Sequence, residues 1–431
     1  MLAWLSPSST RSLRMASVVV VGDAQGHVLR RITLPHEPEL LYGTTASQTV
    51  LIEGMDSWMV TNLASGKTVT LDFGATSPLD IHVLVQAGRW WVLGTDSGST
   101  AYLLDVQSGK LQDLASVGIK QLASPTFAPG EGALLAYAPG PTLIRTGSPA
   151  VVRSVAQGEA ASASFSPDGA RVIYTLKSGS SWNVVSESMD GSESQTLLTS
   201  SVPLIAEFAQ DTDHLLIVDT KGIAVFTISS GKAILVSTAA TIDSVISLGW
   251  STGRRSALLA YRDVKDNYQW LEVDTVAATA RPLSGLAGYL TATSGVAAQV
   301  QLFALSGSGA TPAGFKVLDL ASGSVRSLSG MDPRAAFVAG TARINGTWII
   351  ASTMISASSE SLMQEWIING STGQAAWVEE GLSVRGAISP DGKSVVASRY
   401  DGSTANVDIV DLATGQKSSL GVGYDGVWLA P

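Results

Sequence analysis

A unit of about 43 residues recurs along this 431-residue chain, and the recurrence limits the folds that the chain can adopt. Its clearest sequence motif covers the end of one predicted strand, a turn that contains glycine, and the start of the next strand. Nine steps from Gly26 to Gly415 span 389 residues. Clear copies are NLASGKTVTL (62–71), DVQSGKLQDL (105–114), TISSGKAILV (227–236), DLASGSVRSL (319–328) and DLATGQKSSL (411–420), and fainter ones surround Gly26, Gly147, Gly191, Ala278 and Gly373.

The chemistry of this mark predicts a tight hairpin turn. Asp or Asn at the strand end can hydrogen-bond to the turn backbone, and glycine supplies the positive φ that a short hairpin loop needs. Ala278 stands where the other copies have glycine. We therefore expect a different or strained turn at that position.

A second mark is the phrase SPDG followed by an apolar run, in SFSPDGARVIYTL (164–176) and AISPDGKSVVASRY (387–400). Proline sets φ at the first turn position, aspartate bonds back to its own backbone, and glycine takes the left-handed position. The run that follows each turn is rich in Val, Ile and Tyr, which is typical of a strand buried on both faces.

Together the two marks define four antiparallel strands, named A to D, in each unit. No amphipathic helical segment separates the units, which excludes a parallel α/β sheet. Stacking such sheets around an axis is the β-propeller solution, and 40–45 residues is a typical blade length. Strand C of several units opens with an aromatic residue, which favours packing between blades over a ligand-stacking platform: Trp58, Tyr102, Trp182, Trp270 and Trp366.

The segments FSPDGARVIYTL (165–176) and ISPDGKSVVAS (388–398) resemble the TolB-like, WD40-like (PD40) β-propeller repeats. The periodicity extends this resemblance over nearly the whole chain. The resemblance implies an all-β propeller, but it implies little about activity, because this fold carries many functions.

The repeat count predicts about ten blades, in one large ring or in two smaller rings. Strand A marks run from Trp4 to Trp428, ten steps over 424 residues. We expect VWLAP (427–431) to complete the first blade with strands from VVVVGDAQG (18–26) and HVLRRITL (27–34), because closure removes exposed sheet edges. LAWLSP (2–7) is then surplus. The predicted division is a surplus segment or linker over 1–14 and a repeat array over 15–431.

Composition excludes several classes of function. A net charge of −9 and a pI near 5.0 argue against nucleic acid, which requires clustered Lys and Arg. The absence of cysteine excludes disulfides, thiolate metal sites and thiol catalysis. The four histidines are scattered and lack metal-ligand spacing. We expect no metal or other cofactor, no transmembrane segment, and a monomer that is extracytoplasmic, in the periplasm or at the surface of a bacterium.

The connections between strands B and C and from D to the next A vary, whereas the A–B and C–D turns are stereotyped. Variable loops on a rigid scaffold tend to carry function. Three B–C segments stand out: YRDVKDNYQW (261–270), TMISASSESLMQEW (353–366) and RYDGSTANV (399–407). The candidate binding residues on them are Arg262, Asp263, Lys265, Asp266, Tyr268, Met354, Met363, Tyr400 and Asp401.

No nucleophile elbow, P-loop, H-E-x-x-H or dinucleotide motif occurs in the sequence. We therefore expect a non-catalytic propeller that binds a protein or peptide partner on its variable-loop face. One alternative is a propeller enzyme of the lactonase or lyase type, with a divalent metal at the central funnel. Another is a sensory or cell-envelope module of a larger protein.

Overall fold

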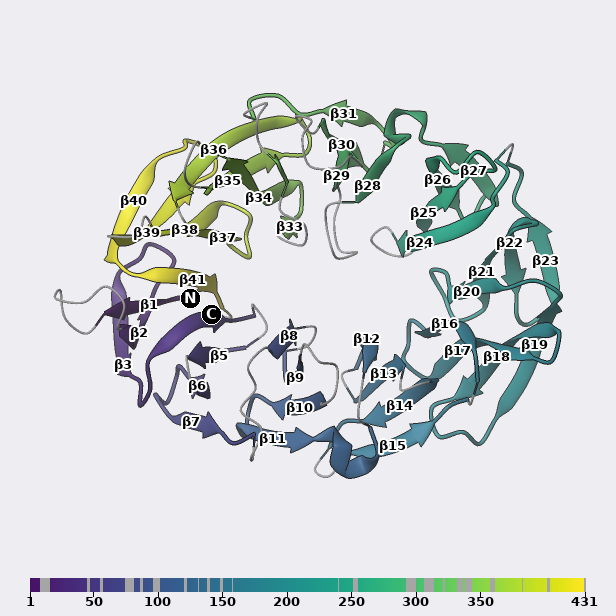
Figure 1. Cartoon of the computed structure of the whole chain (residues 1–431), viewed down its shortest axis with the longest axis horizontal. Coiled ribbons are helices and arrows are strands. Elements are labelled where there is room, and N and C mark those ends of the chain that lie inside the picture. The colour runs from purple at the N-terminus through teal and green to yellow at the C-terminus, as the bar shows by residue number, and fades with distance from the viewer. Residues whose placement is uncertain are drawn as a thin grey trace. The chain divides into compact units, whose positions relative to one another are not determined.

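A computed structural model of the chain describes residues 1–7, 16–44, 47–54, 57–73, 81–85, 88–95, 101–119, 122–130, 132–137, 140–147, 150–156, 158–238, 240–250, 255–291, 300–305, 314–320, 322–331, 336–337, 343–356, 361–381, 383–400 and 404–429. These residues form ten antiparallel sheets of consecutive strands. The sheet of blade 9 has five strands, because two short strands pair with the same neighbour, and the other nine sheets have four. The fold is an all-β propeller of ten blades, as the repeat predicts (Figure 1).

The described chain divides into two compact units, which are considered separately. The first comprises Met1–Asp72, Val106–Lys110 and Gly288–Pro431 and contains blades 8, 9, 10, 1 and 2. Its strands are β1 (Leu2–Pro7), β2 (Ala16–Gly22), β3 (Val28–Thr33) and β41 (Tyr424–Trp428) in blade 1; β4 (Pro38–Tyr42), β5 (Thr49–Gly54), β6 (Trp58–Asn62) and β7 (Thr68–Leu71) in blade 2; β28 (Tyr289–Thr291), β29 (Val300–Leu305), β30 (Phe315–Asp319) and β31 (Val325–Ser327) in blade 8; β32 (Ala336–Phe337), β33 (Arg343–Asn345), β34 (Trp348–Ser356), β35 (Ser361–Asn369) and β36 (Gln374–Gly381) in blade 9; and β37 (Ser383–Ile388), β38 (Ser394–Tyr400), β39 (Ala405–Asp411) and β40 (Lys417–Val422) in blade 10.

The second unit comprises Phe73–Asp105 and Leu111–Ala287 and contains blades 3 to 7. Two short 3-10 helices, η1 (Leu114–Val117) and η3 (Ser284–Leu286), follow strands of this unit. Its strands are β8 (Ile81–Val85), β9 (Trp90–Thr95), β10 (Ala101–Asp105) and β11 (Lys110–Asp113) in blade 3; β12 (Ala123–Phe127), β13 (Ala133–Tyr137), β14 (Pro141–Arg145) and β15 (Val151–Ser154) in blade 4; β16 (Ala160–Phe165), β17 (Arg171–Ser178), β18 (Ser181–Ser188) and β19 (Ser194–Ser200) in blade 5; β20 (Leu204–Phe208), β21 (His214–Asp219), β22 (Gly222–Thr227) and β23 (Lys232–Leu235) in blade 6; and β24 (Ser244–Trp250), β25 (Ser256–Arg262), β26 (Tyr268–Asp274) and β27 (Thr279–Pro282) in blade 7.

Blade 1 joins the two ends of the described chain in one sheet, in the order β3–β2–β1–β41 (Figure 1). The prediction that the C-terminal segment supplies a strand of this blade is confirmed. The expectation that residues 2–7 are surplus is wrong, because β1 lies between β41 and β2, with Leu2 opposite Trp428 and Trp4 opposite Val20. The side chains of Leu2, Ala3, Trp4 and Leu5 in β1 are at most 2% exposed, so this strand is part of the core and not a linker.

Neighbouring blades within each unit share apolar cores. Blades 1 and 2 meet through residues such as Leu5 and Ile52, and blades 9 and 10 through Ile367 and Val410. In the second unit, Phe208 is completely buried between blades 5 and 6. The predicted aromatic residues at the starts of the C strands are 4–6% exposed, which agrees with packing between blades: Trp58, Tyr102, Trp182, Trp270 and Trp366.

The predicted turn chemistry is present in atomic detail. Ser166 donates from Oγ to Asp168 at 2.6 Å, and Asp168 Oδ1 accepts the Ala170 N–H at 3.0 Å. The hydrogen bond from Ser166 is the main reason that the pKa of Asp168 lies below its usual value. At eight C–D turns the glycine adopts positive φ, and Ala278 does so as well, at 49°. These glycines are Gly26, Gly66, Gly109, Gly191, Gly231, Gly323, Gly373 and Gly415. No helix among the described residues is long and apolar enough to span a membrane.

Replacing Ala278 by glycine should stabilise the protein by about 1 kcal/mol, because the left-handed conformation strains any residue with a Cβ atom. The reciprocal change Gly415→Ala should destabilise by a similar amount, since Gly415 has φ 70° in the same kind of turn and open space around its Cβ position. Urea denaturation measures both. A midpoint that falls in Ala278→Gly would contradict the assignment of strain.

Candidate functional site

The hairpin between β25 and β26 carries five of the predicted binding residues. Arg262 donates from Nη1 to Asp266 Oδ1 at 2.5 Å and from Nη2 to the Tyr268 hydroxyl at 2.9 Å. The guanidinium carbon lies 4.8 Å from the centre of the Tyr268 ring, which is a cation–π contact. These three side chains therefore form one cluster on the second unit.

Asp263 holds the turn of the same hairpin through hydrogen bonds to its backbone. Its Oδ1 accepts backbone N–H bonds from Lys265 at 2.9 Å and Asn267 at 3.0 Å, and the bond from Asn267 is the main reason that its pKa is lowered. Asp266 holds a left-handed backbone with φ 62°. The polar groups thus fix the loop conformation, while Val264, 70% exposed, and the exposed Lys265 form its tip.

Met354 and Met363 lie on strands, which corrects the prediction of a loop over residues 353–366. Strand β34 continues to Ser356 and β35 starts at Ser361, so the hairpin is longer and its loop shorter than the sequence indicated. The two methionines are directly paired across the strands, and Met354 is 39% exposed. The strands of this hairpin, at nine residues each, are the longest among the described ones.

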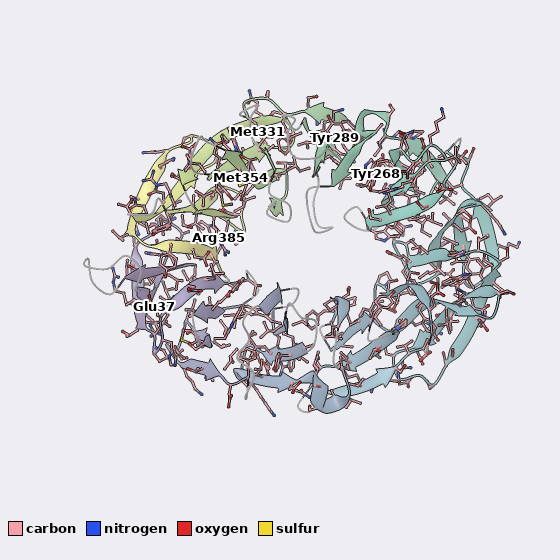
Figure 2. The ribbon with its side chains drawn as sticks, viewed as in Figure 1. Glu37, Tyr268, Tyr289, Met331, Met354 and Arg385 are labelled. Atoms are coloured by element: carbon pink, nitrogen blue, oxygen red, sulfur yellow. The ribbon has the colours of Figure 1, made fainter. Side chains whose placement is uncertain are left out.

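The pair of Met354 and Met363 lies on the side of blade 9 that is next to blade 10. Met363 is paired with Gly381 on β36, and a Cβ atom at Gly381 would lie 2.6 Å from the carbonyl oxygen of Tyr400. The structure therefore brings Met354, Met363 and the backbone of Tyr400 to neighbouring places on blades 9 and 10 (Figure 2 labels Met354). Asp401 lies outside the described residues.

A cluster that the sequence did not reveal is centred on Asp425 in β41. The pairing of β41 with β1 shifts between Ala3 and Leu5, so Asp425 and Gly426 together face Trp4 in a β-bulge. Asp425 has φ 58° and is only 4% exposed. Bulges and strained residues are often found where a side chain is re-aimed for a function.

Asp425 links three blades. Its Oδ2 accepts the backbone N–H of Leu41 on β4 in blade 2, and its Oδ1 accepts a bond from Arg385 Nη1 on β37 in blade 10 at 3.2 Å. The Arg385 side chain is 37% exposed, so its remaining donors can face solvent or a ligand (Figure 2). The arrangement places one accessible guanidinium beside a buried carboxylate.

Tyr42 and Glu53 of blade 2 stand next to this pair. The Tyr42 hydroxyl donates to Glu53 Oε2 at 2.8 Å, and its ring stacks on Trp58 with centroids 6.0 Å apart. Burial raises the pKa of Glu53, and burial followed by the bond with Glu53 raises the pKa of Tyr42. A carboxyl group with a raised pKa beside a tyrosine and an arginine is a candidate for proton exchange.

These groups lie at the ends of strands where the B–C and D–A connections meet, which we call the variable face. Glu53 is near the end of strand B of blade 2, and Asp425 near the start of strand A of blade 1. Among the described residues, no three Asp, Glu or His side chains are arranged to hold a metal ion. The Asp425–Gly426 dipeptide inside an apolar run was the available sequence signal for a bulge.

No family profile matches the chain, and no curated protein matches its sequence. Solved structures similar to it include a eukaryotic initiation factor, at 10% identity over 99% of this chain and 96% of the other, with a TM-score of 0.48. Porphyromonas gingivalis dipeptidyl peptidase 4 has 11% identity over 89% and 59% of the two chains, with a TM-score of 0.47. TolB from Acinetobacter baumannii has 14% identity over 80% and 81%, with a TM-score of 0.28. Likeness at this level assigns no activity to the chain.

Tyr42→Phe should destabilise the protein by about 1 kcal/mol at pH 8 and by less at pH 4. The pKa of Glu53 is higher in the folded protein than in the unfolded chain. Protonated Glu53 therefore favours folding below the unfolded-state pKa, and this contribution is lost as pH rises through the folded-state pKa. Removing the tyrosine donor raises that pKa further, so the loss grows with pH. Urea denaturation at both pH values measures it. In a Glu53→Gln background the effect should no longer depend on pH, and a pH-independent loss in the wild-type background would contradict this role.

Asp425→Ala should cost about 3 kcal/mol, because it leaves the buried Leu41 N–H without its acceptor, removes the partner of Arg385 and keeps a strained backbone. Asp425→Asn should cost only about 1 kcal/mol, since asparagine can accept the Leu41 bond and tolerates positive φ. Guanidinium denaturation measures both variants. Equal losses would show that the hydrogen bond to blade 2 contributes little.

Proposed function

We propose that this chain is a non-catalytic β-propeller that binds a protein or peptide partner through its variable face. The observation that supports the proposal is the cross-strand pair of Met354, 39% exposed, and the partly buried Met363, at the end of the longest described hairpin. Methionine is flexible and polarisable, so an exposed pair adapts to different apolar side chains of a partner.

The two faces of the blades differ in how their connections are built. The C–D turns are held by the side chain of Asp or Asn, as at Asn62, whose Oδ1 accepts the Ser65 N–H at 2.9 Å, and at Asp274, whose Oδ1 accepts from Val276 at 2.9 Å. In such turns the side-chain oxygen of the Asp or Asn is used within the turn itself. The variable face presents Val264 and Met354, both exposed.

Charged side chains lie at the same end of the strands on other blades of the first unit. The half-exposed Arg385 follows on blade 10, and the acidic Glu39 of blade 2 is exposed. An apolar centre with a charged rim is the usual composition of a protein interface. The partner expected here carries apolar anchor side chains with flanking charges of both signs.

A second candidate function is acid–base catalysis by a propeller enzyme on the same face. The raised pKa of Glu53, the hydrogen bond from Tyr42 and the adjacent Arg385 favour it. In that case Glu53 would act as the base, and Arg385 would hold an anionic group of the substrate. Turnover of a substrate that is lost in Glu53→Gln, with folding retained, would select this candidate over the scaffold.

Met354→Lys should abolish selection of the peptides that the wild-type chain enriches from a phage-displayed library. Lysine at this exposed site replaces the apolar contact without disturbing the core. Val28→Lys is the matched control, because Val28 is 47% exposed and begins β3 directly after a C–D turn, at the other end of the blade. Peptides should bind Val28→Lys as they bind wild type, within about twofold. Equal enrichment on Met354→Lys and wild type would contradict the proposal.

A further inference from the structure

A cavity of about 480 Å³ opens between blades 9 and 10, at the end of the blades that carries the A–B and C–D turns. This is the size of many small-molecule sites. Both blades belong to the first unit, and the cavity lies at the opposite end of their strands from Met354 and Tyr400. It is therefore independent of the partner surface proposed above.

One wall of the cavity is formed by Ser329 and Gly330, which follow strand β31 of blade 8. We call this two-residue segment the strap. Ser329 pairs with Gln374 as a parallel bridge, since Ser329 N–H donates to Gly373 at 3.0 Å and Ala375 N–H donates to Ser329 at 2.8 Å. Gly330 adopts φ 91°, and a Cβ atom there would lie 2.3 Å from the Ala375 carbonyl oxygen. The strap is thus hydrogen-bonded in place at a position where only glycine fits.

The floor of the cavity is apolar. Ile367 of blade 9 and Val410 of blade 10 are 6% and 5% exposed and belong to the core shared by the two blades. Leu412 and Trp348 pack against the same core and line the cavity. An apolar side chain of a ligand can therefore extend the core at this point.

The rim carries one positive and one negative charge. Lys417 donates from Nζ to the buried Glu379 at 2.8 Å, which fixes the position of its ammonium group. Asp411 accepts three bonds at Oδ1, from the N–H groups of Ala413 and Thr414 and from the Thr414 hydroxyl. Within the described residues, its Oδ2 accepts none. The hydrogen bond from Thr414 lowers the pKa of Asp411, so the group is a carboxylate at neutral pH.

We propose that this cavity binds a small zwitterion with an apolar side chain, of the free α-amino acid class. Its carboxylate pairs with Lys417, its ammonium group with Asp411 Oδ2, and its side chain packs on Ile367 and Val410. A simple anion is disfavoured by Asp411 and Glu379, and a simple cation by Lys417. A neutral apolar molecule makes no use of the charged rim.

Isothermal titration calorimetry of the full chain with L-leucine tests this assignment. Two analogues separate the charges: 4-methylpentanoic acid lacks the amine, and leucinamide lacks the carboxylate. We expect leucine to bind at least about tenfold more tightly than either, because each analogue lacks one of the two ionic contacts with the rim. No heat with leucine, or equal affinity for all three compounds, would overturn the proposal.

Asp411→Asn is the matching protein variant. Asparagine occupies the equivalent turn position at Asn62 and Asn369 and caps those turns through Oδ1, so the variant should fold. We expect at least about tenfold weaker leucine binding. Asp274→Asn, at the same turn position of blade 7, should leave binding unchanged. Wild-type affinity in Asp411→Asn, or an equal loss in both variants, would overturn the assignment.

Discussion

The constraint on which the rest of the structure depends is that a four-stranded sheet has two apolar faces and cannot cover either one alone. Each described blade meets this need by packing on its neighbours, as Leu5 does between blades 1 and 2 and Phe208 between blades 5 and 6. Both side chains are completely removed from water, a gain of roughly 1.5–3 kcal/mol each. The stability of any blade is therefore a property of its neighbours as much as of its own strands.

Charged side chains between neighbouring blades add hydrogen bonds and ion pairs with a defined geometry to this apolar packing. Asp425 joins blades 10, 1 and 2, and Glu187 of blade 5 accepts hydrogen bonds from Arg153 of blade 4 and from Tyr174 of its own blade. Apolar cores tolerate small shifts of one sheet over another, whereas such bonds have a required geometry. The carboxylates therefore specify the register between neighbouring blades.

The sequence predicted features that follow from local chemistry and repetition. The SPDG turn at Ser166, the left-handed Ala278 and the number of blades all follow from patterns within one 43-residue unit. It did not predict features that depend on contacts between distant residues. The Asp425–Arg385 pair spans 40 positions and two blades. The place of β1 between β41 and β2 depends on pairing between the two ends of the chain, which no pattern within one repeat indicates. The Ser and Glu residues near position 360 predict a loop that includes Met354, whereas strand β34 extends to Ser356 because its pairing with β35 overrides that local signal.

The pairing of β1 with β41 has a consequence for how the chain is connected to other molecules. The backbone N–H of Leu429 donates to Met1 at 3.0 Å, so the entering and leaving ends of the described chain are adjacent. A protein fused to either end would therefore be attached at the same place on blade 1. Tension applied between the two ends would act first on this single antiparallel pair and would break its hydrogen bonds one after another.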